Sequence, residues 1–124
     1  MLPVQPTHPE HRIGSSFPKS YRLRKRSEFV ALKVTAHKYS GAGFLVVWLP
    51  NGDSHARLGI TVSKRVGSSV TRNRIKRFVR EVFRDSCSSL PAVDINIIAR
   101  NSSPNMTFCS VRLDILNAFK FIGM

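Results

Sequence analysis

Apolar residues recur along the chain with two periods, one near 3.6 residues and one of two, and these periods predict its elements. Between residues 70 and 86 they recur at i, i+3, i+4, i+7 and i+8, which is one stripe of an amphipathic helix. Residues 56–63 alternate between apolar and polar side chains, which predicts a half-buried strand. Residues 44–49 are apolar throughout, which predicts a strand covered on both faces.

Further patterns complete the predicted order of elements. Ser27 is a plausible N-cap of a first helix over 27–36, with Glu28 favourable in its first turn. Residues 93–99 predict another strand, and apolar positions from 108 to 119 predict a C-terminal helix. A turn over residues 50–53 indicates that strands 44–49 and 56–63 pair as an antiparallel hairpin. The order α-β-β-α-β-α predicts a small α+β domain, in which helices pack on one mostly antiparallel sheet.

The first 16 residues differ from the rest of the chain. Prolines at positions 3, 6 and 9 disfavour a helix there, and the segment predicts a flexible N-terminal arm before a single domain over 17–124. The arm has no apolar region typical of a secretory signal, and no apolar run approaches the roughly 18 residues of a membrane span. These features lead us to expect a cytoplasmic protein that does not bind membranes.

Charge changes the picture of the central helix. The formal net charge is +13, and Arg72, Lys76, Arg80 and Arg84 form a row with a spacing of four residues. Such like-charged pairs mildly destabilise a helix, so we expect the row to serve a polyanion outside it. The alternative is an ordinary solvated basic face.

Catalytic and metal-binding motifs are absent from the sequence. It has no glycine-rich phosphate loop, and its two cysteines and four histidines lack the spacing of a zinc site. Glu81 and Asp85 are the only acids at i, i+4 on one helix face, where local ion pairing is a simpler role than metal binding. Phe29, Phe44 and Trp48 are candidates for stacking on unpaired bases, with core packing as the alternative.

Two motifs follow one another at the junction between the second strand and the basic helix. One is Ile-Thr-Val-Ser-Lys-Arg-Val-Gly over 60–67, and the other is Arg-Asn-Arg-Ile-Lys-Arg-Phe-Val-Arg over 72–80. Flanking segments agree, namely Phe17-Pro18 and Leu-Pro-Ala-Val-Asp-Ile-Asn-Ile-Ile-Ala-Arg over 90–100. With these motifs the chain resembles the protein subunit of bacterial ribonuclease P over nearly its whole folded part.

The resemblance implies a fold and a function. The fold would be ribosomal protein S5 domain 2-like, with a left-handed β-α-β crossover around the basic helix. The function would be that of a protein cofactor to a catalytic RNA, in the endoribonuclease that removes the 5′ leader from precursor tRNA. The partners would be ribonuclease P RNA and precursor tRNA, with no obligate protein partner evident. Mg²⁺ would be held mainly by the RNA, with no catalytic residue and no metal ligand in this chain.

Site residues are carried over by position from the same resemblance. The run in contact with the catalytic RNA comprises Arg72, Asn73, Arg74, Lys76, Arg77 and Arg80. A cleft between the first helix and the sheet would bind the single-stranded leader, with Phe29 as its aromatic residue. We predict that Lys33, Lys64 and Arg65 lie near Phe29 in this cleft. The family often has a second aromatic residue at the position of Lys33, so this cleft would rely more on charge.

A second function stays open at this point. The chain could be a non-catalytic basic RNA-binding module, such as a ribosome-associated protein, with no part in a turnover reaction. The joint presence of Ser63-Lys64-Arg65 and the run over 72–80 favours the ribonuclease P subunit.

Overall fold

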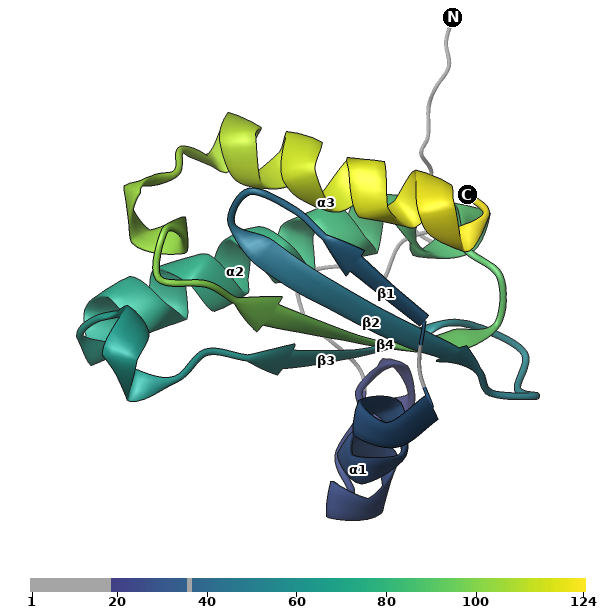
Figure 1. The fold of residues 1–124 in the computed structure, drawn as a ribbon. Helices are drawn as coiled ribbons and strands as arrows, with labels where there is room; N and C mark the ends of the chain where they lie inside the picture. The colour runs from purple at the N-terminus through teal and green to yellow at the C-terminus, as the bar shows by residue number, and fades with distance from the viewer. Residues whose placement is uncertain (1–18, 36) are drawn as a thin grey trace, which may run out of the picture.

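The computed structural model describes residues 19–35 and 37–124, so the predicted arm over 1–16 lies outside the described residues. Within them the helices are α1 (Arg26–Thr35), α2 (Ser69–Ser86) and α3 (Phe108–Ile122). The strands are β1 (His37–Ser40), β2 (Phe44–Pro50), β3 (Arg57–Thr61) and β4 (Val93–Ala99) (Figure 1). Short 3-10 turns also occur: η3 (Lys19–Tyr21), η4 (Lys64–Val66), η5 (Cys87–Ser89) and η6 (Ser103–Asn105).

The strands form one sheet in the order β1-β2-β4-β3. β1 with β2 and β2 with β4 are antiparallel, whereas β3 pairs with β4 in parallel. The predicted α+β class and the mostly antiparallel sheet are therefore confirmed. The short strand β1 was not predicted, because His37-Lys38-Tyr39-Ser40 has no apolar alternation; it makes the order α-β-β-β-α-β-α.

The predicted hairpin between residues 44–49 and 56–63 is wrong, because β4 lies between β2 and β3. β4 is covered on both faces, since Ile95 and Ile97 are fully buried on one face and Asn96 is buried on the other. Such a strand belongs in the interior of a sheet. Its parallel partner β3 requires a crossover connection, which α2 supplies. The left-handedness of this crossover stays a prediction.

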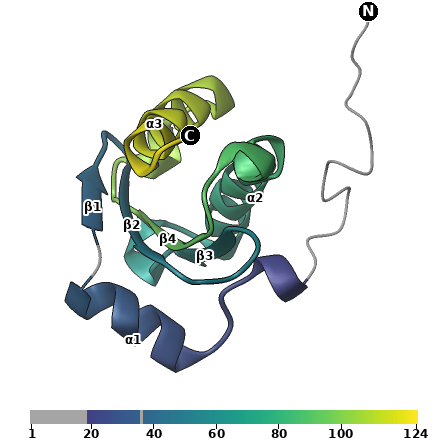
Figure 2. The same cartoon turned by 90° about the vertical axis from the view of Figure 1, so that its right-hand side faces the viewer.

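The two faces of the sheet are covered unequally. α2 and α3 pack side by side on one face, and α1 lies on the other (Figure 2). The larger core lies under α2 and α3 and includes Phe44, Phe83, Ile95, Ile115 and Phe119. The core under α1 is small and consists of Leu23, Leu32 and Val47 with partly buried neighbours. In the described part of the chain, no helix has the length and hydropathy to span a membrane.

Local signals place the helix starts. The side chain of Ser68 accepts a hydrogen bond from the Thr71 backbone N–H at 3.3 Å, so Ser68 is the N-cap of α2, as one of the two predicted choices. The predicted N-cap Ser27 is wrong, because α1 already begins at Arg26. Glu28 in the first turn instead bonds back to the chain before the helix, since its Oε1 accepts hydrogen bonds from the backbone N–H groups of Arg24 and Lys25 at 2.9 and 3.0 Å.

Candidate nucleic-acid interface

The basic residues of α2 lie outside its buried stripe, which consists of Ile75, Val79, Val82 and Phe83. Asn73 and Arg77 are exposed. Arg72, Lys76, Arg80 and Arg74 are partly buried and flank them. The helix thus presents one continuous basic surface, anchored to the sheet by its apolar side.

Several of these arginines are held in place by the protein itself. Arg72 donates from Nε to the carbonyl oxygen of Gly67 at 3.1 Å, which ties it to the start of the helix. Arg74 donates from Nη2 to the carbonyl oxygen of Pro104 at 2.9 Å, so part of its guanidinium is used within the fold. Arg77 lies 5.6 Å from the centroid of the Phe78 ring. A held guanidinium loses less conformational entropy when it binds a partner.

Arg80 is partly buried and lies near other positive charges. Burial lowers the pKa of its guanidinium, and the nearby charges of Arg84 and Arg22 lower it further. Arg22 belongs to the segment before α1, so positive charge from two parts of the chain meets beside α2. A polyanion bound there would relieve this repulsion, whereas water alone screens it only in part.

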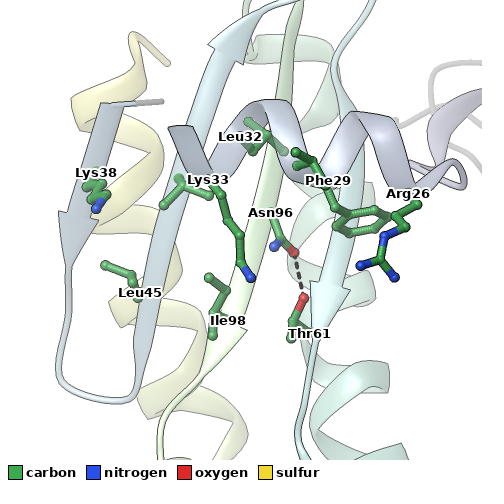
Figure 3. Close-up of a pocket in the computed structure, with 11 residues that line it drawn as sticks. Arg26, Phe29, Leu32, Lys33, Lys38, Leu45, Thr61, Asn96 and Ile98 are labelled. Carbon is green, nitrogen blue, oxygen red and sulfur yellow. Dashed lines mark hydrogen bonds between the residues drawn. The ribbon is translucent and has the colours of Figure 1, made fainter. Parts of the chain in front are cut away.

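A cleft of about 580 Å³ lies between α1 and the face of the sheet below it (Figure 3). Phe29, Lys33 and Arg26 line it from α1, and Lys38 lines it from β1. Its floor is formed by side chains of β2, β3 and β4, namely Leu45, Val47, Thr61, Asn96 and Ile98. The cleft therefore combines an aromatic ring, an apolar floor and cations at its rim.

The position of Phe29 depends on the glycine at position 59, which has no side chain. A Cβ atom at Gly59 would lie 2.6 Å from Cε1 of Phe29, so only glycine lets the ring lie against β3 at this point. Phe29 is partly buried, which leaves part of its ring open to the cleft. The structure thus places Phe29 and Lys33 together in the cleft that the sequence predicted.

The other residues predicted for the cleft or for base stacking lie elsewhere. Lys64 and Arg65 are exposed in η4, which connects β3 to α2, and they do not line the cleft. Phe44 is 1% exposed and belongs to the larger core, which excludes it as a stacking residue. Trp48 is partly buried and packs against the same core.

Sequence reasoning missed several residues of the cleft. Lys38 was missed because β1 was not predicted, and Arg26 because the helix was expected to start one residue later. Thr61 and Asn96 were missed because no local pattern shows that β3 and β4 are neighbours. The available signal was Asn96 itself, a polar side chain inside an apolar strand.

Charged side chains hold α1 against the sheet. Arg57 of β3 donates from Nε and Nη2 to the two carboxylate oxygens of Asp94, both at 2.8 Å, and its Nη1 lies 2.9 Å from Oε2 of Glu28. Hydrogen bonds from Lys25 and Arg24 and the charge of Arg57 lower the pKa of Glu28 against the opposing effect of burial. Asp94 and Glu28 raise the pKa of Arg57. We call Glu28, Arg57 and Asp94 the latch.

Comparison with known proteins decides between the two functions left open by the sequence. The family model described as Ribonuclease P matches residues 17–123. The chain belongs to the ribonuclease P protein family. It is therefore a protein subunit of the endoribonuclease that removes the 5′ leader of precursor tRNA.

Relatives within the ribonuclease P family support this assignment along most of the chain. The chain is 42% identical to the ribonuclease P protein component of Desulforapulum autotrophicum over 112 residues, which cover 89% of this chain and 96% of that protein. The ribonuclease P protein of Staphylococcus aureus has a similar structure, with a TM-score of 0.80, 35% identity and coverage of 85% and 97%. For the protein of Thermotoga maritima the TM-score is 0.76 at 33% identity, with coverage of 83% and 98%.

The ribonuclease P fold brings few acids together in this chain. Among the residues that the structure describes, no group of three or more His, Cys, Asp or Glu side chains could hold a metal ion. Glu81 and Asp85, the pair singled out in the sequence, are both exposed on α2. The side chains that the structure does assemble are cationic, aromatic and amide groups, the types that suit contacts with nucleic acid.

Proposed function

We propose that this subunit binds the catalytic RNA of ribonuclease P through α2. Its contact residues are Arg72, Asn73, Arg74, Lys76, Arg77 and Arg80. The support is a helix whose apolar side is buried and whose other side presents partly anchored cations. Arginine suits phosphates because its forked donors match two oxygens at once. The positive charges of Arg84 and Arg22 near Arg80 add to the attraction of this surface for a polyanion.

We further propose that the cleft under α1 binds the single-stranded leader of precursor tRNA. The observation that carries this proposal is the partly open ring of Phe29 between an apolar floor and the cations Lys33, Lys38 and Arg26. A base stacked on an aromatic ring gains about 1–3 kcal/mol, and the cations can pair with the phosphates on either side of that base. Single-stranded RNA offers both groups in alternation, whereas a duplex hides its bases.

Lys64 and Arg65 have a different part in this proposal. η4 begins three residues after Thr61, which lines the cleft, and ends just before the N-cap of α2. Exposed cations at this point lie along the chain between the two RNA-binding surfaces. They would contact phosphates between the leader and the catalytic RNA.

The subunit's contribution to the reaction would be electrostatic and positional. Mg²⁺ would be held mainly by the RNA, in the cytoplasm, and the protein would need no further protein partner. Cations on α2 and in the cleft screen repulsion between precursor and catalytic RNA, which lowers the Mg²⁺ concentration needed. Binding the leader also orients the scissile bond.

The experiment is to compare precursor and mature tRNA binding by the holoenzyme at low Mg²⁺. Phe29→Ala should weaken precursor binding by roughly 5- to 100-fold, the equivalent of one lost stacking contact. Mature tRNA, which has no leader, should bind nearly as before. Phe121→Ala is the matched control, because Phe121 on α3 is 72% exposed and does not line the cleft. Equal weakening of both tRNAs would show that Phe29 only stabilises the fold.

A further inference from the structure

The floor of the cleft carries one polar pair in a mostly apolar surface. Oγ1 of Thr61 on β3 donates to Oδ1 of Asn96 on β4 at 3.2 Å, while Leu45, Val47 and Ile98 make up the apolar floor around them (Figure 3). Asn96 is 7% exposed. A buried amide is unfavourable unless its polar atoms are hydrogen-bonded. The hydrogen bonds of Asn96 therefore have to be accounted for.

Asn96 uses only part of its hydrogen-bonding capacity within the protein. A side-chain amide has two N–H donors and two acceptor lone pairs. Across the residues that the structure describes, the bond from Thr61 is the one hydrogen bond made by this amide. Figure 3 shows its oxygen directed at Thr61 and its nitrogen directed away. Both N–H groups and one lone pair are thus left for an occupant of the cleft.

The surroundings of Asn96 suit a nucleobase. Gly59 stands opposite Asn96 in the register of β3 and β4, and the ring of Phe29 lies against Gly59. The ring and the amide are therefore neighbours, so a base can stack on one and turn its edge to the other. A phosphate does not fit the floor, because a charge would lose its hydration against Leu45 and Ile98.

We propose that Asn96 hydrogen-bonds the edge of one leader base and thereby determines the sequence preference of the cleft. Thr61 holds the amide in one orientation, with Nδ2 as a donor beside the remaining lone pair of Oδ1. A donor beside an acceptor is the pattern with which asparagine pairs with a base through two hydrogen bonds. The inference rests on the proposed function, since it takes the leader as the occupant, and adds base selection at one leader position.

The test uses precursor tRNAs in which each leader position carries each of the four bases in turn. They compete for cleavage by holoenzyme containing the unchanged chain, Asn96→Leu, Thr61→Val or Asn96→Asp. With the unchanged chain, kcat/KM at one leader position should differ by roughly 5- to 100-fold between the best and the worst base. Asn96→Leu should reduce this difference to below twofold, and Thr61→Val should reduce it in part.

Two further variants sharpen the result. Asn96→Asp replaces the donor by an acceptor, so it should change which base is preferred at that position. Asn101→Leu removes an exposed amide from the loop after β4 and should leave the base preference unchanged. Far-ultraviolet circular dichroism and thermal unfolding check that each variant folds. Thr61 is exposed, so Thr61→Val keeps the test valid if Asn96→Leu fails to fold.

The outcomes separate this inference from the proposed function. If Phe29→Ala weakens precursor binding but the unchanged chain shows no base preference, the leader occupies the cleft and Asn96 selects nothing. A preference that survives in Asn96→Leu overturns the inference as well. If Phe29→Ala leaves precursor binding unchanged, the cleft does not bind the leader and both proposals fail.

Discussion

Replacing Arg57 by alanine is expected to release α1 from the sheet and leave the rest of the fold in place. Arg57 connects Asp94 of β4 to Glu28 of α1, and it is the residue common to all contacts of the latch. The apolar contacts of α1 are few, because the core below it is centred on Leu23, Leu32 and Val47. The latch should therefore contribute a large share of the free energy that docks α1.

The free energy lost on replacing Arg57 depends on the hydrogen bonds that each carboxylate keeps. The side chains of Arg57, Glu28 and Asp94 are 23%, 19% and 15% exposed, so water screens them only partly. Without Arg57, Glu28 still accepts two backbone hydrogen bonds, and Asp94 still accepts one from Nδ2 of Asn51 at 3.0 Å. The loss should thus be smaller than the 3–5 kcal/mol for breaking a fully buried pair, at about 2 kcal/mol.

Native-state hydrogen exchange measures this local effect. A loss of about 2 kcal/mol raises the open population of α1 roughly 30-fold, so its amides should exchange about 30-fold faster in Arg57→Ala. Amides of α3 should keep their rates. Arg112→Ala is the matched control, because Arg112 is exposed on α3. Unchanged exchange in α1 would refute the latch, and equal acceleration in all helices would show that Arg57 stabilises the whole fold.

The pH dependence of the same exchange gives an independent check. The pKa of Glu28 in the folded chain lies below its ordinary value of 4.5, so the folded state favours its charged form. Its contribution to docking is therefore complete above about pH 4.5 and is lost as the pH falls through the lowered pKa. Once each rate is corrected for the intrinsic change of amide exchange with pH, Glu28→Gln should remove this dependence of α1 protection on pH. A dependence that persists in this variant would point to another carboxylate.

Two further predictions concern RNA. Arg77→Ala should weaken binding of the catalytic RNA more than Arg24→Ala and should reduce the salt slope of binding by roughly one unit, because α2 is packed against the core by its apolar side. Affinity titrations over a range of salt concentrations measure both, and equal losses would indicate diffuse charge attraction. Replacing Glu81 and Asp85 by Gln and Asn should leave single-turnover cleavage within a few-fold of the unchanged holoenzyme. A loss of several hundred-fold with binding intact would place catalysis in the protein.

The elements that the sequence predicted best are those with a local cause. The stripe that includes Ile75 and Val79 and the cap at Ser68 lie within one stretch of chain, and they predicted α2 to within a residue. The strand order, in contrast, is not determined by any local sequence pattern. The alternation of apolar and polar residues in β3 is the same whether its neighbour is a parallel strand or a hairpin partner. Only β4, which is buried on both faces, distinguishes the two arrangements.

The cleft shows the same limit at the level of side chains. Phe29 and Lys33 were found by resemblance, and both lie on one helix. Asn96 meets Thr61 across 35 positions of sequence, and Arg57 meets Asp94 across 37. Such side-chain contacts depend on which strands are neighbours. One wrongly predicted strand pairing therefore prevents all of them from being predicted. Gly59 in an alternating strand and Asn96 in an apolar strand were signals that another group approaches the sheet closely at these positions.

The position of β4 has a consequence for how two RNA surfaces share one small domain. Because β3 and β4 are parallel neighbours, the chain must leave β3 at one end of the sheet, cross through α2 and return. α2 covers the face of the sheet opposite α1 (Figure 2). Because the cleft is lined by α1 and the sheet, the basic helix and the cleft lie on opposite faces of the same sheet. In the proposed function, leader and catalytic RNA therefore bind on opposite faces of the sheet. A change at Gly59 or Asn96 can alter the cleft while α2 keeps its contacts, which is why leader selection and RNA assembly can be tested separately.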